Sequence, residues 1–123
     1  MKKIKITIPL KHNFKLKPTE IDAYQSAIPG LAIQRVFRYN YKDNLVDIGF
    51  WTITHIASGM CLISGTWILE KRQEAERVIG ALQEGAPSMD WTILDPIEMY
   101  KIAAKARVGS ILRATINKIR KGD

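Results

Sequence analysis

The sequence predicts an α+β fold, with an antiparallel sheet of three to five strands and two or three helices, the last one long and C-terminal. Apolar and polar residues alternate along Leu31–Tyr39 and again along Ile48–Ile56, which is the period of a β-strand with two different faces. Over residues 70–84, apolar residues instead recur every three or four positions, as on the buried side of an α-helix. With 123 residues and 46% apolar content, the chain is expected to form a single domain over residues 1–123.

The N-terminal part is predicted to contain an edge strand, a short helix and a central strand. Lys2–Ile8 carries isoleucines on one face, and lysines on an edge strand discourage pairing with other chains. Residues 18–27 begin with Pro-Thr and lead to an Ile-Pro-Gly segment that must end any helix, so a short helix is predicted there. A polar turn at residues 40–44 then joins the strand Leu31–Tyr39 to the next strand.

Residues 48–69 form a run of 22 residues without a formal charge, with Trp51 and Trp67 near its ends. A membrane helix needs about 20 apolar residues, so the length alone would allow one. Polar residues are scattered through the run, however, and His55 would lie deep in the hydrocarbon. The alternation and the turn residues Ala57-Ser58-Gly59, with Gly59 free to adopt a positive φ, favour a β-hairpin. Both tryptophans are then expected to be at least partly buried.

The C-terminal half is predicted to be mainly helical. The helix over residues 70–84 is followed by Gly85, a common end signal. After a short strand-like segment, Trp91–Leu94, the sequence Asp95-Pro96-Ile97-Glu98 begins another helix, with Asp as N-cap, Pro first and Glu third. Its apolar residues continue to the end of the chain on about half of the circumference. Gly109-Ser110 can bend or break this long helix.

Basic residues are concentrated at both ends of the chain. Of the formal net charge of +7, residues 1–42 contribute +7, residues 43–95 contribute −5 and residues 96–123 contribute +5. The first 17 residues contain six lysines and no acidic residue. Basic clusters attract polyanions locally through counterion release, which favours nucleic-acid binding, DNA or RNA. The alternative is that the lysines only keep a small protein soluble.

The strand LAIQRVFRY carries the best local signal for such binding. In a regular strand Arg35, Phe37 and Tyr39 share one face, and Arg38 and Lys42 lie close by. A cationic, aromatic surface of this kind can stack unpaired bases and hold phosphates. Alternatively, the two aromatic rings belong to the core and the arginine caps the edge. The predicted nucleic-acid-binding residues are Lys2, Lys3, Lys5, Arg35, Phe37, Arg38, Tyr39 and Lys42.

A protein-interaction module is the alternative function. Nearly every predicted strand has large apolar residues on both faces, and the C-terminal helix has an apolar sector longer than a small sheet can cover. In this hypothesis the protein forms a homodimer or caps a partner protein, and the lysines only keep it soluble. The predicted interface residues are Ile111, Leu112, Ile116 and Ile119.

The sequence gives little support for an enzyme or a metalloprotein. The single cysteine, Cys61, cannot form an internal disulfide, and no cluster of Cys and His has zinc spacing. His55 and Ser58 lie across a turn without a third orienting residue, and the glycines match no phosphate-binding fingerprint. The N-terminus lacks the cleavage site of a signal peptide. We therefore expect a non-enzymatic accessory protein of the cytoplasm, without metal, cofactor or membrane span.

Parts of the chain resemble two families of nucleic-acid-binding domains in their order of elements. A helix, three antiparallel strands and a helix, expected over residues 18–84, resemble double-stranded-RNA-binding domains. The segment GTWILEKRQEAERV after a sheet resembles the three-strand-plus-helix DNA-binding domains of some integrases. In place of the basic cluster that RNA-binding domains use at the helix start, this chain has Glu70, Lys71, Arg72, Glu74 and Glu76. The resemblance therefore concerns the fold, which does not by itself imply the function.

Overall fold

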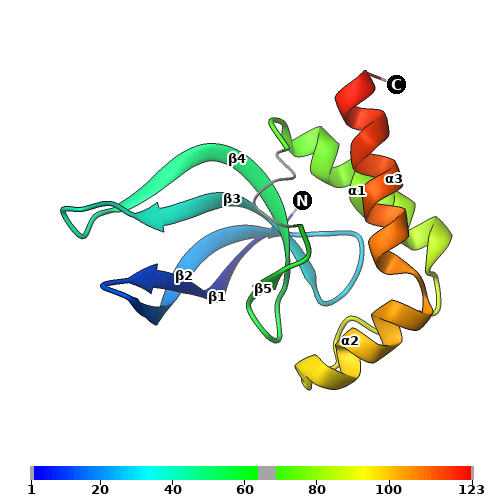
Figure 1. Ribbon diagram of the computed structural model, residues 1–123, viewed down its shortest axis with the longest axis horizontal. Helices are drawn as coiled ribbons and strands as arrows, with labels where there is room; N and C mark the ends of the chain where they lie inside the picture. Colours follow the sequence, from blue (N-terminus) through cyan, green and yellow to red (C-terminus); the bar gives the residue numbers. More distant parts are fainter. Residues whose placement is uncertain (1, 64–68, 123) are drawn as a thin grey trace.

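The computed structural model describes residues 2–63 and 69–122 and confirms the predicted α+β fold (Figure 1). Within these residues a curled antiparallel sheet has the strand order β1-β2-β3-β4-β5, and three helices follow it along the chain. The helices gather at one end of the sheet, while the β1–β2 and β3–β4 hairpins extend away from them. The elements are β1 (Lys3–His12), β2 (Lys15–Gln25), β3 (Leu31–Tyr39), β4 (Leu45–His55), β5 (Met60–Cys61), α1 (Arg72–Gly85), α2 (Pro96–Lys105) and α3 (Val108–Lys121).

Strands β1 and β2 form a long hairpin, and β1 is an edge strand as predicted. The short helix predicted over residues 18–27 is wrong, because most of that segment belongs to β2. Burial alternates along β2, where Thr19, Ile21 and Ala23 are buried between exposed neighbours, as the period of a strand requires. Pairing with the isoleucine-rich β1 overrides the helix-start signal of Pro-Thr. The order of elements that resembles RNA-binding domains is therefore not present.

The remaining strands confirm the first arm of the hairpin predicted over residues 48–69 and shorten the second arm. Strand β4 contains the alternating segment, Gly59 adopts a φ of +72° in the turn, and β5 is only two residues long. Trp51 is partly buried as predicted and bridges to Leu69. Trp67 lies outside the described residues. In the part of the chain that the structure describes, no helix is long and apolar enough to cross a membrane.

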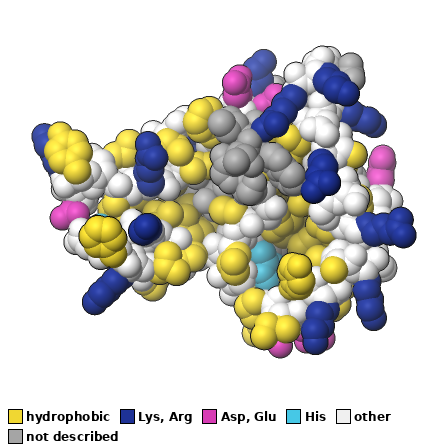
Figure 2. Space-filling view, viewed as in Figure 1, with side chains coloured by type: hydrophobic (Ala, Val, Ile, Leu, Met, Phe, Trp, Pro, Cys, Tyr) yellow, Lys and Arg dark blue, Asp and Glu magenta, His cyan; other side chains and the backbone are white. Residues whose placement is uncertain are grey.

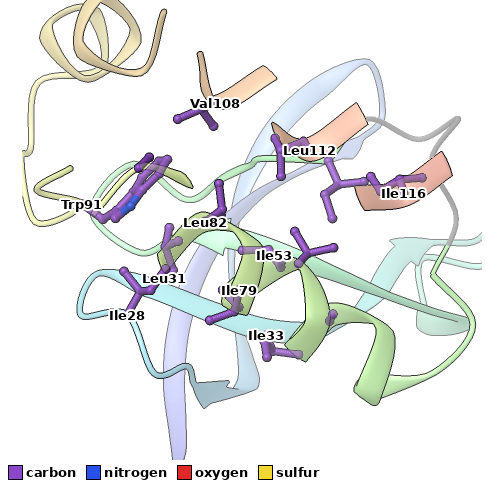
Figure 3. Packing of buried hydrophobic residues seen from close by; sticks show 14 of the residues in the cluster. Ile28, Leu31, Ile33, Ile53, Ile79, Leu82, Trp91, Val108, Leu112 and Ile116 are labelled. Atoms are coloured by element: carbon purple, nitrogen blue, oxygen red, sulfur yellow. The ribbon is translucent and has the colours of Figure 1, made fainter. Parts of the chain in front are cut away.

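Two clusters of buried side chains stabilise the sheet. The first lies between the sheet and the helices, and Figure 3 shows side chains of β3 and β4 pointing toward those of α1 and α3. The second lies on the other face of the curled sheet and consists of Ile6, Ile8, Ile21, Ala23 and Ala32. Because Ala32 belongs to the second cluster and its neighbour Ile33 to the first, β3 is buried on both faces beside the helices.

Helix α1 confirms the helix predicted over residues 70–84. Its apolar residues at helical spacing, Ala75, Val78, Ile79 and Leu82, are all buried. The Glu74 side chain accepts the backbone N–H of Lys71 at 3.1 Å and that of Glu70 at 2.8 Å, which satisfies two donors at the helix start. The segment Trp91–Leu94, predicted as strand-like, instead begins with a turn at residues 91–92 and has no regular structure at residues 93–94; Trp91 is buried in the first cluster.

The single C-terminal helix predicted from Asp95 is two helices in the structure. Asp95 caps α2 as predicted, with its Oδ1 accepting the N–H of Ile97 at 3.0 Å. The break lies at Arg107, which has a left-handed φ of +56°, and not at Gly109-Ser110. The change of direction lets α3 bury one face against the first cluster. The buried residues of α3 are Val108, Leu112 and Ile116.

Candidate nucleic-acid interface

The turn between β1 and β2 projects an aromatic ring into solvent. His12 pairs with Lys15, so Asn13 and Phe14 form a two-residue loop, and both have positive φ values of 49° and 66°. This is the pattern of a type I′ turn, which matches the twist of a hairpin and favours glycine or asparagine. Phe14 is 96% exposed, and Leu16 next to the turn is also exposed.

The turn between β3 and β4 carries a second exposed ring. The Asn40 Oδ1 accepts the backbone N–H of Lys42 at 2.9 Å and that of Asn44 at 3.0 Å, which fixes the shape of the turn. Tyr41 is 90% exposed, and the Lys42 Nζ lies 5.7 Å from the centre of its ring. The aromatic and cationic side chains therefore occur together at this tip.

The two turns are far apart in the sequence and lie next to each other in space. His12 Nε2 is 3.0 Å from Asp43 Oδ1, which links one turn to the other. Tyr39 lies between the hairpins, where its ring meets that of His12 edge-on at 4.7 Å and its hydroxyl is 3.2 Å from Thr19 Oγ1. The Lys17 Nζ lies 5.3 Å from the centre of the same tyrosine ring.

These contacts define one surface, which we call the hairpin-tip surface. It combines the two exposed aromatic rings with five exposed cations on the ends of the four strands and their turns, as the left side of Figure 2 illustrates. Asp43, the acidic residue in these turns, faces His12. The residues of the hairpin-tip surface are Lys11, Phe14, Lys15, Leu16, Lys17, Arg38, Tyr41 and Lys42.

The structure divides the predicted nucleic-acid-binding residues among separate places. Arg38 and Lys42 belong to the hairpin-tip surface. Lys3 and Lys5, in contrast, lie at the other end of the β1–β2 hairpin, where their ammonium groups are 3.7 Å and 2.7 Å from the carboxylate of Asp22. The hydrogen bond between Lys5 and Asp22 raises the pKa of Lys5 and lowers that of Asp22. Lys2 is exposed just before β1.

Arg35 does not share its surroundings with Phe37 and Tyr39, although regular alternation predicted a common face. The β3–β4 register is irregular between Arg35 and Phe37. Arg35 donates from Nε to Asp47 Oδ2 at 2.9 Å, and its guanidinium lies 5.1 Å from the centre of the Trp51 ring. Its hydrogen bond is the main reason why the pKa of Asp47 is lowered. Phe37 is partly buried against the second cluster.

The predicted interface residues of the C-terminal helix are placed against the core. Leu112 and Ile116 are buried, and Ile111 and Ile119 pack against the same cluster while remaining partly exposed. The core of the same chain thus already covers most of the apolar sector of α3. The large apolar side chains that remain exposed nearby are instead at the start of α2, where Leu94, Ile97 and Tyr100 reach into solvent.

His55 and Ser58 are in contact, but no carboxylate among the described residues orients them. His55 Nδ1 and Ser58 Oγ are 2.8 Å apart, but neither interacts with a carboxylate in the contacts of the described residues. Residues 2–63 and 69–122 also contain no group of three or more His, Cys, Asp or Glu side chains that could hold a metal ion.

The exposed rings and three of the lysines of the hairpin-tip surface were missed from the sequence. The signal available was the run of lysines in the first 17 residues, with Phe14 inside it.

Comparison of this chain with protein-family models, curated proteins and solved structures finds no match.

Proposed function

We propose that this protein binds nucleic acid through the hairpin-tip surface, as an accessory protein without catalytic activity, and that it prefers single-stranded segments. The observation that carries the proposal is the joint exposure of Phe14 and Tyr41 among five cations. Proteins that bind single strands combine a positive surface for the backbone with aromatic rings on which bases stack. The two rings project from turns held together by the His12–Asp43 contact, so they can meet the same strand.

The conformation of Phe14 supports a role in binding. A bulky residue with positive φ is uncommon, and glycine or asparagine would be more stable at this position of the turn. The ring is almost fully exposed, so it does not offset this strain by packing in the core. Strained, exposed aromatic residues are typical of binding sites, where the partner supplies the missing contacts.

The charges of the same surface support an anionic ligand. Lys11, Lys15 and Lys17 come from the β1–β2 hairpin, and Arg38 and Lys42 from the β3–β4 hairpin. Lys15 and Lys17 lie on the His12 face of their hairpin and Lys11 on the opposite face, so the cations surround the tip and give it a locally positive potential, at which phosphates can replace bound counterions. Lys3 and Lys5 contribute less in this proposal, because Asp22 already faces both ammonium groups.

Fluorescence anisotropy with labelled oligothymidylate of about 16 nucleotides tests the proposal. Binding should be strong at about 50 mM salt and much weaker at about 200 mM. The combined replacement Lys11→Gln, Lys15→Gln and Lys17→Gln should weaken binding and reduce the salt slope by about 0.7 for each phosphate that the variant no longer neutralises. The matched control combines Lys101→Gln, Lys105→Gln and Lys118→Gln, which removes the same charge from exposed positions of α2 and α3. This control should change the affinity and the salt slope far less.

Duplex DNA and RNA of the same length, and vesicles containing anionic phospholipid, are measured in parallel. A single-strand preference that disappears in Tyr41→Ala supports stacking by the exposed ring. If the wild-type protein binds no nucleic acid at about 50 mM salt, or binds only the vesicles, the proposal is wrong.

The second candidate function is still a protein-interaction module, but the proposed interface is now at the start of α2 and no longer on α3. Leu94, Ile97 and Tyr100 are exposed together around the start of α2, and large exposed apolar side chains that gather in one place mark interaction sites. A homodimer or a partner protein could cover them. Sedimentation of the wild-type protein and of Ile97→Asp at high concentration tests this: a dimer that dissociates in the variant supports it, and a monomer in both cases removes the homodimer.

A further inference from the structure

A cavity of about 410 Å³ opens between the β4–β5 turn and the two C-terminal helices. Its walls come from both sides: Met60 and Leu62 near β5, Trp91 before α2, and Met99 and Leu112 from the helices. The volume falls within the range of roughly 300–1,000 Å³ typical of small-molecule sites, which are also mainly apolar. Figure 2 shows hydrophobic side chains gathered on this face between the sheet and the helices.

Small residues on the helices leave this space open. Ala103 and Ala104 of α2 and Gly109 of α3 line the cavity. A Cβ atom added to Gly109 would have no heavy atom within 4 Å, so the space beside it is not filled by another side chain. Small residues therefore form part of the cavity wall on the helix side.

His55 provides a buried polar group in the wall of this cavity. Its side chain is on the helix-facing side of β4, opposite Leu31 on one neighbouring strand and Met60 on the other. The residue is 4% exposed, and its Nε2 has no hydrogen-bond partner among the described residues. A buried polar nitrogen without a partner destabilises the fold, so a ligand that forms a hydrogen bond with it would be stabilised there.

The contacts of Ser58 allow Nε2 of His55 to be the donor nitrogen. Ser58 Oγ accepts the backbone N–H of Met60 at 3.2 Å, so its own proton is available for His55 Nδ1 at 2.8 Å. When Ser58 donates this proton, Nδ1 is the acceptor and the ring carries its own proton on Nε2. In this tautomer the unpartnered nitrogen is a donor, and an acceptor oxygen is the group that complements it.

We propose that this cavity is a binding site for a small apolar carboxylic acid, whose hydrocarbon part lies among Met60, Trp91 and Leu112 and whose carboxylate accepts from His55 Nε2. Hydrogen bonds to charged acceptors are stronger than those to neutral ones, which favours an acid over an alcohol. One wall comes from the basic C-terminal segment, residues 96–123, whose net charge of +5 favours an anion nearby, although the residues that line the cavity are uncharged. Met60 is mostly exposed beside His55, and its flexible side chain can move to admit the ligand.

Decanoate and 1-decanol, two probes that differ in the head group, test the proposal in ¹H–¹⁵N NMR titrations up to about 1 mM. Decanoate should shift the amide signals of His55, Ser58 and Gly109, and it should bind at least about tenfold more tightly than decanol. His55→Leu should reduce the affinity for decanoate by about tenfold or more and leave that for decanol nearly unchanged.

Gly109→Leu adds a large side chain to the cavity wall and should abolish the shifts, while circular dichroism and thermal unfolding report that the variant is folded. Gly80→Leu is the matched control, because Gly80 is also helical with no atom within 4 Å of an added Cβ, but it does not line the cavity. Its affinity should equal that of the wild type. Equal binding of both probes, shifts confined to another face, or unchanged affinity of a folded Gly109→Leu protein would each overturn the proposal.

Discussion

The imidazole Nε2 of His12 lies 3.0 Å from the carboxylate Oδ1 of Asp43, which is 31 residues further along the sequence. This contact joins the turns of two different hairpins. The β2–β3 pairing is limited to two residue pairs, Tyr24–Ile33 and Gln25–Ala32, at the end near the helices. The distal halves of the hairpins therefore depend on side-chain contacts to stay together. This relationship makes the hairpin-tip surface a single unit.

His12→Ala should loosen both turns at once. Without the imidazole, Asp43 is left without its partner and Tyr39 without its edge-on ring contact, so local opening should become more frequent on both hairpins. Amide hydrogen exchange measures this, and exchange should become faster at Asn44 in the other turn as well as beside residue 12. Lys11→Ala, at an exposed position of the same strand, is the control. Faster exchange in the β1–β2 turn alone would contradict the coupling.

Phe14→Gly should make the protein more stable while weakening its binding to single strands. Glycine accepts the positive φ of this position without strain, and the exposed ring contributes little to folding. Removal of the ring on which a base stacks should weaken binding by about 1–3 kcal/mol. Urea unfolding and anisotropy measurements on the same preparation test both effects.

Phe37→Ala provides the contrast for this prediction. Its ring packs against the second cluster, so truncation should destabilise the fold by up to about 3–5 kcal/mol. A stacking residue and a core residue are thus distinguished by opposite effects on stability. Reduced stability in Phe14→Gly, or unchanged binding, would contradict the role assigned to Phe14.

Elements with a regular pattern of buried residues could be predicted from the sequence. The helical spacing of α1 follows from burial of one side against the first cluster, and β3 packs against a different cluster on each of its two faces. The Asp95-Pro96 start of α2 was also predicted, because an N-cap is a local interaction. These signals involve residues close together in the chain.

The features that were missed depend on contacts between distant segments. Strand β2 is held by pairing with β1, whereas its own sequence begins with a helix-start signal. The prediction that Arg35, Phe37 and Tyr39 share one face assumed a regular strand. The irregularity that separates Arg35 from the other two lies in the pairing of β3 with β4, so the sequence of β3 alone does not reveal it. The exposure of Phe14 depends on positive φ values in its turn, which neither Asn13 nor Phe14 requires.

Gly59→Ala should be strongly destabilising. Gly59 has a φ of +72°, and an added Cβ would lie 2.7 Å from the backbone oxygen of Thr7. Backbone atoms of β1 cannot move without disturbing the sheet, so the steric cost adds to the roughly 1–2 kcal/mol of a left-handed non-glycine residue. Gly49→Ala is the control: its φ is +91°, but no atom lies within 4 Å of the added Cβ. Chemical unfolding of both variants should show a clearly larger decrease in stability for Gly59→Ala.

The Arg35–Asp47 pair should make a small, pH-dependent contribution to stability. The hydrogen bond from Arg35 lowers the pKa of Asp47 from its ordinary value of 3.8. Stabilisation from a lowered carboxyl pKa is fully present above the unfolded value and disappears as the pH falls through the folded value. Because both side chains are partly exposed, the effect should stay below about 1 kcal/mol.

Asp47→Asn tests this dependence. The wild type should be more stable than the variant at about pH 6, and the difference should shrink at about pH 3, where the carboxyl becomes protonated. Urea unfolding at the two pH values gives the difference directly. A difference that is constant from about pH 6 to about pH 3 would show that the carboxylate charge is not responsible.

Arg107→Gly should stabilise the protein by about 1 kcal/mol, because Arg107 occupies the left-handed region at the junction of α2 and α3. Glycine adopts this conformation without the steric cost of a Cβ, and the direction of α3 over the core should not change. If α2 and α3 instead formed one continuous helix in solution, position 107 would be a helix interior, where glycine is about 1 kcal/mol less favourable than alanine. Thermal unfolding therefore distinguishes the two arrangements by the sign of the change. Arg113→Gly, at an exposed position inside α3, is the matched control and should be destabilising.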